Sequence, residues 1–534
     1  MWFKQSLKSH KKDMSYWVIN LIFVLFLFYF VRTNRQGLHI FQLEHYYKDR
    51  YLKWVKQNRN VVFNIKKIAL IVISALILMF KDVKIGSILT IATYLLLWIT
   101  APRKKEKKPF VVTKRVKRQI ITYLIIIAAL GYIVNLLHST TSIIILDIFA
   151  IFTYLFVYVV AAITTPIEKI INDSFCRKAS KKLKSNPELK VIGITGSYGK
   201  TSTKNIVNTI LSQKYNSLMT PESYNTTMGV VRTINENLKP IHNMFVCEMG
   251  AKYRGDIKEI CDIVHPDIAI ITAVGPQHLD TFKTLDNVFK TKFELVDSLD
   301  EEKGLAFVNW EDENIKNIDI SKKFIKYGLH EDSDYYALNI EVGEMGSDFD
   351  VRMPGGRIIR AKTKLLGKHN VLNIVAGVAV ADKLGLSEDQ IRMGIKSIKP
   401  VEHRLQIRPN PNGSIIIDDS YNANTRGSTT ALEVLGSFKG RKRILITPGI
   451  VELGDQAYEL NKKLGKEATK HCDFVILVGE KQAKPMYDGL KEEKYPESNI
   501  MIAKNLDEAI KKMNELMDSN TVVLLENDLP DNYL

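Results

Sequence analysis

The sequence predicts an α-helical membrane region followed by a soluble part of the α/β class. Four or five strongly apolar runs lie within the first 165 residues. From Pro187 onward, short runs rich in β-branched residues alternate with segments of helical periodicity. This alternation is typical of parallel strands joined by crossover helices, and ligands of such sheets gather at the carboxyl ends of the strands. A length of 534 residues also allows about three domains.

The apolar runs have the composition of membrane-spanning helices, which need ~20 residues to cross ~30 Å of hydrocarbon. The second run is short, so it either begins earlier, near residue 61, or forms a hairpin with the third. We expect no cleaved signal peptide, because the first run has no small-residue cleavage site and further runs follow it. The runs are residues 16–31, 68–80, 83–101, 120–137 and 143–163.

Basic residues are concentrated beside these runs. The formal net charge is +17, yet many positive side chains lie before residue 120, which favours anionic membrane lipid over nucleic acid as the partner. Residues 32–67 and 103–118 each carry nine Lys and Arg, whereas residues 138–142 carry none. The positive-inside rule then places both basic loops, and everything after residue 163, in the cytoplasm. The N-terminus would lie outside, although four early lysines argue for the opposite: Lys4, Lys8, Lys11 and Lys12.

Residues 41–55 interleave aromatic and basic side chains. We expect an amphipathic helix lying among the lipid headgroups, and a solvated linker is the alternative. The four cysteines all follow the last apolar run and include no C-x-x-C pair. We therefore expect neither a structural zinc site nor a disulfide framework.

The soluble part is organised around a glycine-rich stretch, residues 192–204 (IGITGSYGKTSTK). It follows an apolar run and precedes a helix-like segment, so the order is strand, loop, helix. In such a loop the backbone N–H groups and the helix N-terminus bind phosphate, Lys200 can reach the β/γ-phosphates, and Thr201 can ligate Mg²⁺. Ile194 occupies the first glycine position of G-x-x-x-x-G-K-[ST], so an ordinary tight turn is the alternative.

The shorter form present here, T-G-S-x-G-K-T-S, resembles the nucleotide loop of the Mur ligases, the ATP-dependent amide-forming enzymes of peptidoglycan assembly, and of folylpolyglutamate synthetase. The resemblance covers about residues 187–534 and is closest to the D-alanyl-D-alanine-adding branch. It implies an ATP-binding central domain with a parallel sheet over 166–400 and a Rossmann-like C-terminal domain over 401–534, and the apolar runs predict a transmembrane region over 1–165. The membrane segments take the place of the family's nucleotide-sugar domain. The ATP ligands implied in the loop are Gly196, Ser197, Gly199, Lys200, Thr201 and Ser202.

Two further residues follow predicted strands. Glu248 ends the apolar run 244–248, where a carboxylate could hold a cation beside the phosphates, and His278 follows the run 268–274. The resemblance implies that Glu248 and His278 bind magnesium with Thr201. It also implies that Lys292, in K-x-K-x-E, is carbamylated and bridges metals, whereas a solvated helix face is the alternative for this lysine.

The remaining implied site residues are distributed along the chain. Asn225 matches one position of the family's substrate loop G-N-x-N-N-x-x-G-V, and Asn370 and Asn373 match the adenine-contacting G-x-H-N-x-x-N. In the C-terminal part, H-R and D-D-S-Y-N-A-N imply that Arg404 and Asp419 reach the nucleotide. The incoming amine would meet Tyr421, Asn422 and Asn424. The basic K-G-S-R element that usually follows the family's final strand is replaced by the acidic residues 526–531.

The implied activity is that of an ATP- and Mg²⁺-dependent ligase at the bacterial plasma membrane, with its catalytic domains in the cytoplasm. A substrate carboxylate would be activated as an acyl phosphate and joined to the amine of an amino acid or short peptide. A membrane anchor favours a lipid-linked envelope precursor as acceptor, with other envelope-synthesis proteins as possible partners. The alternatives are a tethered D-alanyl-D-alanine ligase, poly-γ-glutamate-type synthesis, and a membrane scaffold that binds ATP without turnover. A transporter is less favoured, because Asp147 is the main charge within the apolar runs.

Overall fold

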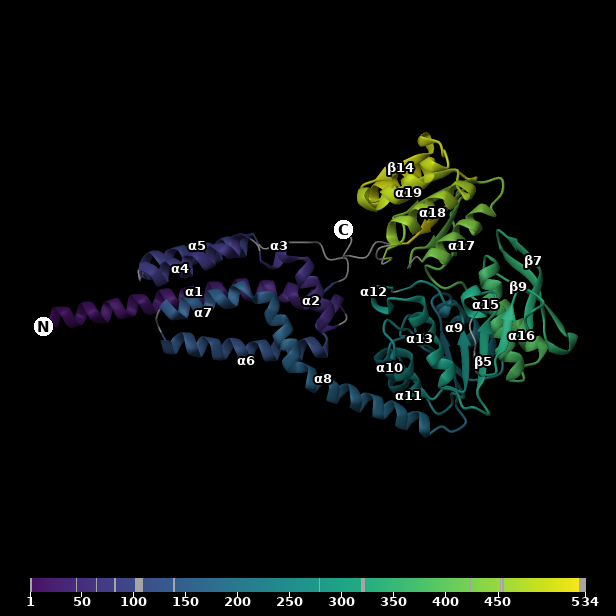
Figure 1. Cartoon of the computed structure of the whole chain (residues 1–534), viewed down its shortest axis with the longest axis horizontal. Helices are drawn as coiled ribbons and strands as arrows, with labels where there is room; N and C mark the ends of the chain where they lie inside the picture. Colours follow the sequence, from purple (N-terminus) through teal and green to yellow (C-terminus); the bar gives the residue numbers. More distant parts are fainter. Residues whose placement is uncertain are drawn as a thin grey trace. The chain divides into compact units, whose positions relative to one another are not determined.

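The structure is a computed structural model of the whole chain (Figure 1). Residues 1–173 and 174–534 form two compact units, and each is described by itself. The structure describes residues 2–44, 46–63, 65–80, 83–100, 109–137, 140–277, 279–317, 322–421, 424–451, 453 and 456–527. Of these residues, only the backbone is described at 2–15, 65–66, 77–80, 83–86, 140, 279–280 and 481.

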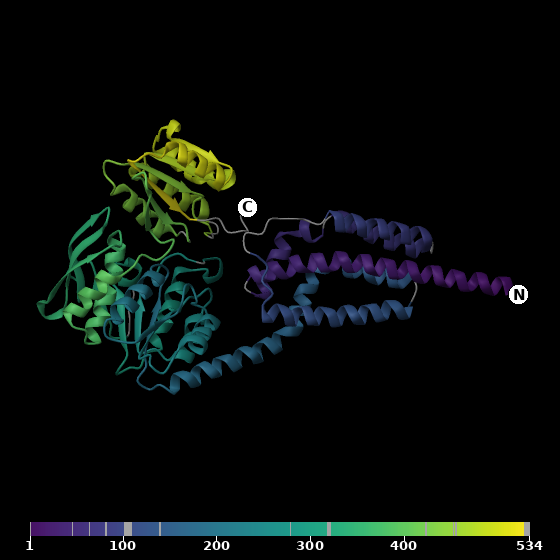
Figure 2. The same ribbon diagram turned by 180° about the vertical axis from the view of Figure 1, so that it is seen from behind.

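The first unit is made of helices, several of which run nearly parallel to one another (Figures 1 and 2). Three of its helices contain stretches long and apolar enough to cross a membrane: Tyr16–Leu43, Lys114–Leu137 and Thr153–Lys184. Shorter apolar stretches are Lys67–Leu76, Ser87–Ile99 and Thr141–Ile151. The helices are α1 (Trp2–Leu43), α2 (Lys48–Gln57), α3 (Arg59–Val62), α4 (Ile65–Phe80), α5 (Val83–Ile99), α6 (Lys114–Leu137), α7 (Thr140–Ile151) and α8 (Thr153–Lys184).

Two of the predicted apolar runs differ in detail from the structure. The run 143–163 is divided between α7 and α8, because the helix is interrupted at Phe152. The Thr153 hydroxyl there donates to the carbonyls of Phe149 and Ala150, a side-chain bond that competes with the helical ladder. The second run does not begin near residue 61, because α3 is a separate turn. It packs as α4 against α5, as the hairpin alternative predicts.

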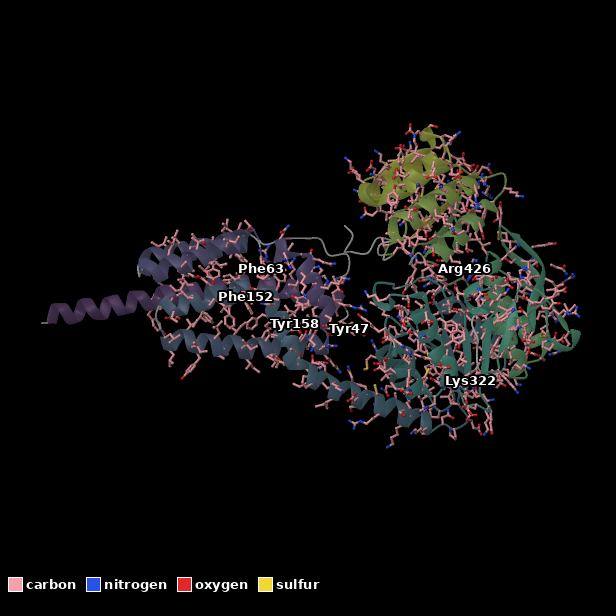
Figure 3. All side chains as sticks on the ribbon, viewed as in Figure 1. Tyr47, Phe63, Phe152, Tyr158, Lys322 and Arg426 are labelled. Atoms are coloured by element: carbon pink, nitrogen blue, oxygen red, sulfur yellow. The ribbon has the colours of Figure 1, made fainter. Side chains whose placement is uncertain are left out.

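Helix α2 is the amphipathic helix predicted within residues 41–55, but its apolar side faces protein rather than lipid. Tyr51 and Val55 are buried, and the Tyr51 hydroxyl donates to the carbonyl of Tyr154 at 2.8 Å. The exposed side carries Lys53 and Lys56. Elsewhere in this unit the rings of Phe63 and Phe152 pack edge to face, with their centroids 6.0 Å apart (Figure 3).

The second unit begins with a nine-stranded sheet of order β2-β3-β1-β4-β5-β6-β7-β8-β9. Its strands are parallel from β2 to β7, and β7, β8 and β9 form an antiparallel meander. The strands are β1 (Lys190–Thr195), β2 (Ser217–Met219), β3 (Met244–Glu248), β4 (Ile268–Ile271), β5 (Leu305–Asn309), β6 (Ile325–Gly328), β7 (Tyr335–Gly343), β8 (Gly346–Arg352) and β9 (Ile358–Thr363).

Helices cover both faces of this sheet. Apolar side chains of α9, α15 and α16 pack on one face, around Ile192, Val246 and Ile270. Those of α10, α11 and α13 pack on the other, around Val191, Phe245 and Ile271. The helices are α9 (Lys200–Leu211), α10 (Thr227–Asn237), α11 (Asp256–Val264), α12 (Leu279–Phe282), α13 (Leu285–Asp297), α14 (Glu313–Lys316), α15 (Lys368–Lys383) and α16 (Glu388–Ser397).

A second sheet of six strands has the order β10-β11-β15-β12-β13-β14 and is parallel except for β10. Helices α17, α18 and α19 cover one face and α20 the other. The strands are β10 (Gln406–Pro409), β11 (Ile415–Asp419), β12 (Lys442–Thr447), β13 (Phe474–Val478), β14 (Ile500–Ala503) and β15 (Thr521–Glu526). The helices are α17 (Thr425–Gly436), α18 (Ala457–His471), α19 (Glu480–Glu492) and α20 (Leu506–Leu516). The two sheets confirm the predicted α/β class with a central parallel sheet and a C-terminal α/β domain.

Candidate active site

The glycine loop connects β1 to α9 at the carboxyl edge of the first sheet, as the sequence predicts. Gly196 has a φ of 152°, and a Cβ there would lie 2.1 Å from Thr272 Oγ1 and 2.8 Å from the nitrogen of Ala273. Gly199, with a φ of 81°, precedes the first residue of α9. The Ser197 N–H donates to the carbonyl of Ala273 at 2.7 Å. The loop is therefore held against the end of β4, with the N-terminus of α9 directed at it.

Lys200 is the first residue of α9, and its ammonium lies over the loop. Its Nζ donates to the carbonyls of Gly196 at 2.7 Å and Ser197 at 3.2 Å. Burial, opposed by the charge of Glu248 and assisted by that of Arg404, lowers the pKa of Lys200 to about 8. Thr201 and Ser202 follow in the first turn of α9. This arrangement can present an ammonium and helix N–H groups to a phosphate chain.

Glu248, at the end of β3, is buried beside this loop. Its Oε1 accepts hydrogen bonds from Asn225 Nδ2 at 2.9 Å and Thr201 Oγ1 at 3.3 Å. Its Oε2 lies 3.0 Å from Lys204 Nζ but accepts no aligned hydrogen bond. Burial opposes ionisation, yet the ammonium groups of Lys204 and Lys200 hold the pKa of Glu248 below its usual value. The carboxylate is therefore ionised at neutral pH and keeps acceptor capacity for a cation.

These residues fit a magnesium ion bound with a nucleotide. Mg²⁺ is commonly held by one or two protein oxygens, with phosphates and water completing its shell. Thr201 Oγ1 and the Glu248 carboxylate are the oxygens in place here. The described residues include no group of three or more His, Cys, Asp or Glu that could hold a metal ion. The predicted ligand His278 lies outside the described residues.

Lys204 belongs to this site, although the sequence analysis gave it no role. It is fully buried one turn after Lys200 and pairs with Glu248. The sequence shows Lys204 within GKTSTK, but it does not show that Lys204 pairs with Glu248, because Glu248 lies on a strand more distant along the chain. The predicted Lys292 is also buried, on α13, and burial lowers its pKa well below the usual value, with the charge of Lys200 adding to the effect. A lowered pKa favours the neutral amine, which is the form that reacts with carbon dioxide. This is compatible with the carbamylation of Lys292, which stays a prediction.

The two predicted adenine ligands lie at the start of α15. Asn373 Oδ1 accepts a hydrogen bond from Thr203 Oγ1 at 3.2 Å and lies beside Gly199. Asn370 does not cap the helix, because Gly367 occupies the cap position and Asn370 lies in the first turn. Its Nδ2 donates to the carbonyl of Leu366 at 2.8 Å. Asn373 therefore adjoins the glycine loop, and adenine contact stays a prediction for both residues.

Arg404, Asp419 and Tyr421 meet at the carboxyl edge of the second sheet. The Arg404 guanidinium lies over the Tyr421 ring, 4.6 Å from its centroid. Asp419 Oδ1 accepts from the Leu405 N–H at 3.2 Å, and burial raises the pKa of Asp419 to about 6. Asn424 caps α17 by accepting from the Gly427 N–H at 2.8 Å. Asn422 lies outside the described residues, so of the five predicted C-terminal residues the structure brings Arg404, Asp419 and Tyr421 together.

Asp312 connects the end of the first sheet to α17 of the C-terminal domain. Its buried Oδ2 accepts from the Val274 N–H at 3.0 Å and lies 3.4 Å from Arg426 Nη1 (Figure 3). Thr425, the neighbour of Arg426, bonds the Tyr198 side chain within the glycine loop. The start of α17 is thus in contact with the loop that would hold phosphate.

The acidic element predicted after the last strand begins with a buried carboxyl group. Glu526 is 2% exposed, and it accepts hydrogen bonds from Ser428 Oγ and, at 2.6 Å, from Thr447 Oγ1. Burial raises the pKa of Glu526 to about 7, and the neighbouring Asp419 adds to the increase. Residues 528–531 lie outside the described residues.

This carboxyl group should make stability depend on pH. Its folded pKa of about 7 exceeds the ordinary value of 4.5, so the protonated form favours folding, and ionisation destabilises as pH rises through that window. The loss should be about 3 kcal/mol by pH 8. We expect Glu526→Gln to flatten the melting temperature measured from pH 5 to 8, and the exposed control Glu497→Gln to keep the wild-type slope. Equal slopes in all three proteins would contradict this assignment.

The part of the chain that contains this site is similar to domains of known proteins. Residues 194–381 match the Mur ligase middle domain, and residues 403–526 match the Mur ligase glutamate ligase domain, together more than half of the chain. The UDP-N-acetylmuramoyl-tripeptide--D-alanyl-D-alanine ligase of Escherichia coli is 32% identical over 295 residues, which are 54% of this chain and 64% of the relative. That of Bacillus subtilis is 28% identical over 280 residues, 52% of this chain and 59% of the relative. The chain thus spans less than two thirds of these curated relatives.

Solved structures agree with the sequence relatives. MurF from Acinetobacter baumannii superimposes with a TM-score of 0.60 and 27% identity, covering 67% of this chain and 77% of that chain. MurF ligase from Thermotoga maritima in complex with ADP gives a TM-score of 0.60 and 26% identity, covering 67% of this chain and 80% of that chain. The segments that match the two domain families, 194–381 and 403–526, contain the glycine loop, Glu248 and the Arg404–Asp419 edge described above. The chain belongs to the Mur ligase family, whose middle and C-terminal domains it carries.

Proposed function

We propose that this protein is an ATP-dependent ligase of bacterial cell-envelope synthesis, which joins a carboxylate to the amine of an amino acid or short peptide. The observation that carries the proposal is the meeting of Lys200, Thr201 and Glu248 at one loop, on the edge where parallel sheets bind ligands. The similarity to a MurF ligase solved with ADP supports ATP as the nucleotide.

The described residues divide the chemistry between binding and charge stabilisation. Loop N–H groups and the start of α9 would hold the phosphates, and Lys200 would turn from the loop carbonyls toward the γ-phosphate. Thr201 and Glu248 would hold Mg²⁺, which when bound neutralises phosphate charge. The substrate carboxylate attacks the γ-phosphorus, the bond to the β-phosphate oxygen breaks, and ADP leaves as the acyl phosphate forms. The neutral amine then attacks the acyl carbon, phosphate leaves, and the nitrogen loses a proton to solvent as the amide forms. No protein nucleophile is required, so orientation between the two domains supplies much of the rate.

We further propose that the first unit anchors the enzyme in the bacterial plasma membrane as a multi-pass region, with the domains after residue 163 in the cytoplasm. Three helices have the necessary length and apolar character. The outer side of α6 exposes large apolar side chains, Ile121, Leu124, Ile125 and Leu136, which suits contact with lipid. The basic loops support the cytoplasmic side. Such an anchor favours a lipid-linked envelope precursor as the acceptor.

A second candidate function is a tethered ligase that adds D-alanyl-D-alanine to a soluble UDP-linked tripeptide. The names and identity of the relatives favour it. A scaffold that binds ATP without turnover is disfavoured, because such a protein would not require the metal ligands that Thr201 and Glu248 provide.

The test is ADP release by purified full-length protein in detergent. One arm supplies D-alanyl-D-alanine with UDP-N-acetylmuramoyl-tripeptide, and the other supplies amino acids or dipeptides with a polyprenyl-linked precursor. Turnover that needs both an amine and the lipid supports the membrane-acceptor ligase. Turnover only in the soluble arm establishes the tethered enzyme instead. Nucleotide binding without turnover in either arm would overturn the ligase proposal.

A further inference from the structure

The ammonium of Lys204 joins two parts of the site that are separate in the sequence. Its Nζ lies 3.0 Å from Glu248 Oε2, and the two side chains are 1% and 2% exposed. The same Nζ donates a hydrogen bond to the main-chain carbonyl of Glu222. A buried lysine is costly unless its charge is paired and its N–H groups find acceptors. Lys200 lies four residues earlier on the same helix face, where a second positive charge is repulsive.

Glu222 belongs to a loop, residues 220–226, in which Thr220 and Asn225 also contact Glu248. The Glu248 N–H donates to Thr220 Oγ1 at 3.0 Å, and Asn225 Nδ2 donates to Glu248 Oε1 at 2.9 Å. The carbonyl of Asn225 also accepts from the Gly250 N–H at 2.7 Å. These hydrogen bonds attach both ends of the 220–226 loop to β3 and to Gly250 just after it, and Lys204 attaches its middle.

The backbone of the 220–226 loop is strained at the point that Lys204 contacts. Glu222 has a φ of 40°, in the left-handed region that favours glycine. Such a conformation persists in a residue other than glycine only where its surroundings hold it. Glu222 and Ser223 are themselves exposed. The turn is held by the Tyr224 N–H, which donates to the carbonyl of Pro221, by the Asn225 N–H, which donates to that of Ser223, and by the buried ammonium of Lys204 on the carbonyl of Glu222.

We propose that Lys204 is a positioning residue that fixes the 220–226 loop to Glu248, and thereby links the nucleotide and metal site to the substrate side. A cation at Glu248 competes with the ammonium for the same carboxylate, so occupancy of the site would change the restraint on the loop that carries Asn225. Binding on either side would then affect the other by the same factor. The identity of the nucleotide rests on the proposed function, whereas the contacts of Lys204 do not.

The first test is amide hydrogen exchange in the full-length, nucleotide-free protein in detergent. We expect Lys204→Met, which keeps the alkyl volume and removes the donor, to raise exchange about tenfold or more in the 220–226 loop and at Gly250. The matched control is Lys214→Met, which removes an exposed lysine that bonds the carbonyl of Gly385 and should leave the loop unchanged. Equal loop exchange in wild type and Lys204→Met would overturn the proposal.

A second variant covers the case in which Lys204→Met unfolds because Glu248 is left buried and unpaired. The double variant Lys204→Met, Glu248→Gln removes both charges and should regain the wild-type melting temperature. We expect its loop to exchange as fast as in an intact single variant, because the carbonyl of Glu222 still lacks its donor. Wild-type protection of the loop in the double variant would show that Lys204 serves charge balance alone.

The nucleotide arm uses the non-hydrolysable ATP analogue AMP-PNP with and without Mg²⁺. In the wild type, the analogue with Mg²⁺ should change exchange in the 220–226 loop. In Lys204→Met, where no ammonium competes for Glu248, the analogue with Mg²⁺ should bind at least as tightly as in the wild type and leave loop exchange unchanged from that of the nucleotide-free variant. A wild-type protein that binds no AMP-PNP would overturn the proposed function, while the nucleotide-free comparison would still decide the role of Lys204.

Discussion

Lys200→Met is expected to reduce ATP turnover by about 10²–10³-fold, the effect typical of removing one charged group from a transition state. The ammonium lies over the glycine loop and bonds two of its carbonyls. It is the group placed to meet charge that develops on a transferred phosphoryl group. The measurement is ADP release by full-length protein, with whichever substrate pair supports wild-type turnover.

The stability of the same variant separates a catalytic loss from a folding defect. Burial lowers the pKa of Lys200 to about 8 from 10.5, so the charged form is disfavoured in the folded protein. This penalty is present below pH 8 and disappears as pH rises toward the unfolded value. Methionine avoids it, and we expect a melting temperature at pH 7 no lower than that of the wild type. Lys214→Met controls for loss of a lysine elsewhere, and turnover near the wild-type rate in Lys200→Met would contradict the assignment.

Gly196→Ala is expected to destabilise the 174–534 unit by about 3 kcal/mol or more and to abolish nucleotide binding. The new Cβ would lie 2.1 Å from Thr272 Oγ1 and within 3.0 Å of both the nitrogen and the carbonyl oxygen of Ala273. The threonine could rotate, but the backbone around residue 273 is held by the Thr272 N–H, which donates to the carbonyl of Thr195, and by the Val274 N–H, which donates to Asp312. Relief therefore requires the loop itself to move, which displaces the N–H groups that would bind phosphate.

Gly255→Ala is the matched control for this substitution. Gly255 also has a positive φ, 92°, but an added Cβ would meet nothing within 4 Å. Only the left-handed backbone is penalised, by about 1–2 kcal/mol. Urea denaturation of both variants, together with AMP-PNP binding, makes the comparison. A smaller loss of stability in Gly196→Ala than in Gly255→Ala would show that the loop tolerates a side chain.

Much of the domain built on the nine-stranded sheet could be predicted, because the sequence patterns that indicate its elements are local. The strand, glycine loop and helix around residue 200 lie within one continuous segment, so spacing alone indicates their order. Glu248 was predicted to lie beside the loop from its place at a strand end, and the contact with Thr201 confirms that position. Parallel strands bring such ends to one edge whatever the length of the connecting helix.

Features that depend on contacts between distant segments were missed or misjudged. The apolar side of α2 was expected to face lipid, but it packs against Tyr154 in α8, a partner about a hundred residues away. The interruption between α7 and α8 was missed, because an apolar run shows where a helix can form but not where a side chain such as Thr153 competes with its ladder.

The sequence alone determined the class of fold, the phosphate loop and the identity of the residues at its edge, since periodicity and spacing within short segments carry that information. Tertiary structure decided which charges are buried and paired. Lys204 and Glu526 are of residue types that usually lie on the surface. Only the fold places Lys204 against Glu248, and Glu526 between the hydroxyl groups of Ser428 and Thr447. Burial depends on what the rest of the chain packs against a residue, and a charge that loses water must find its partner there.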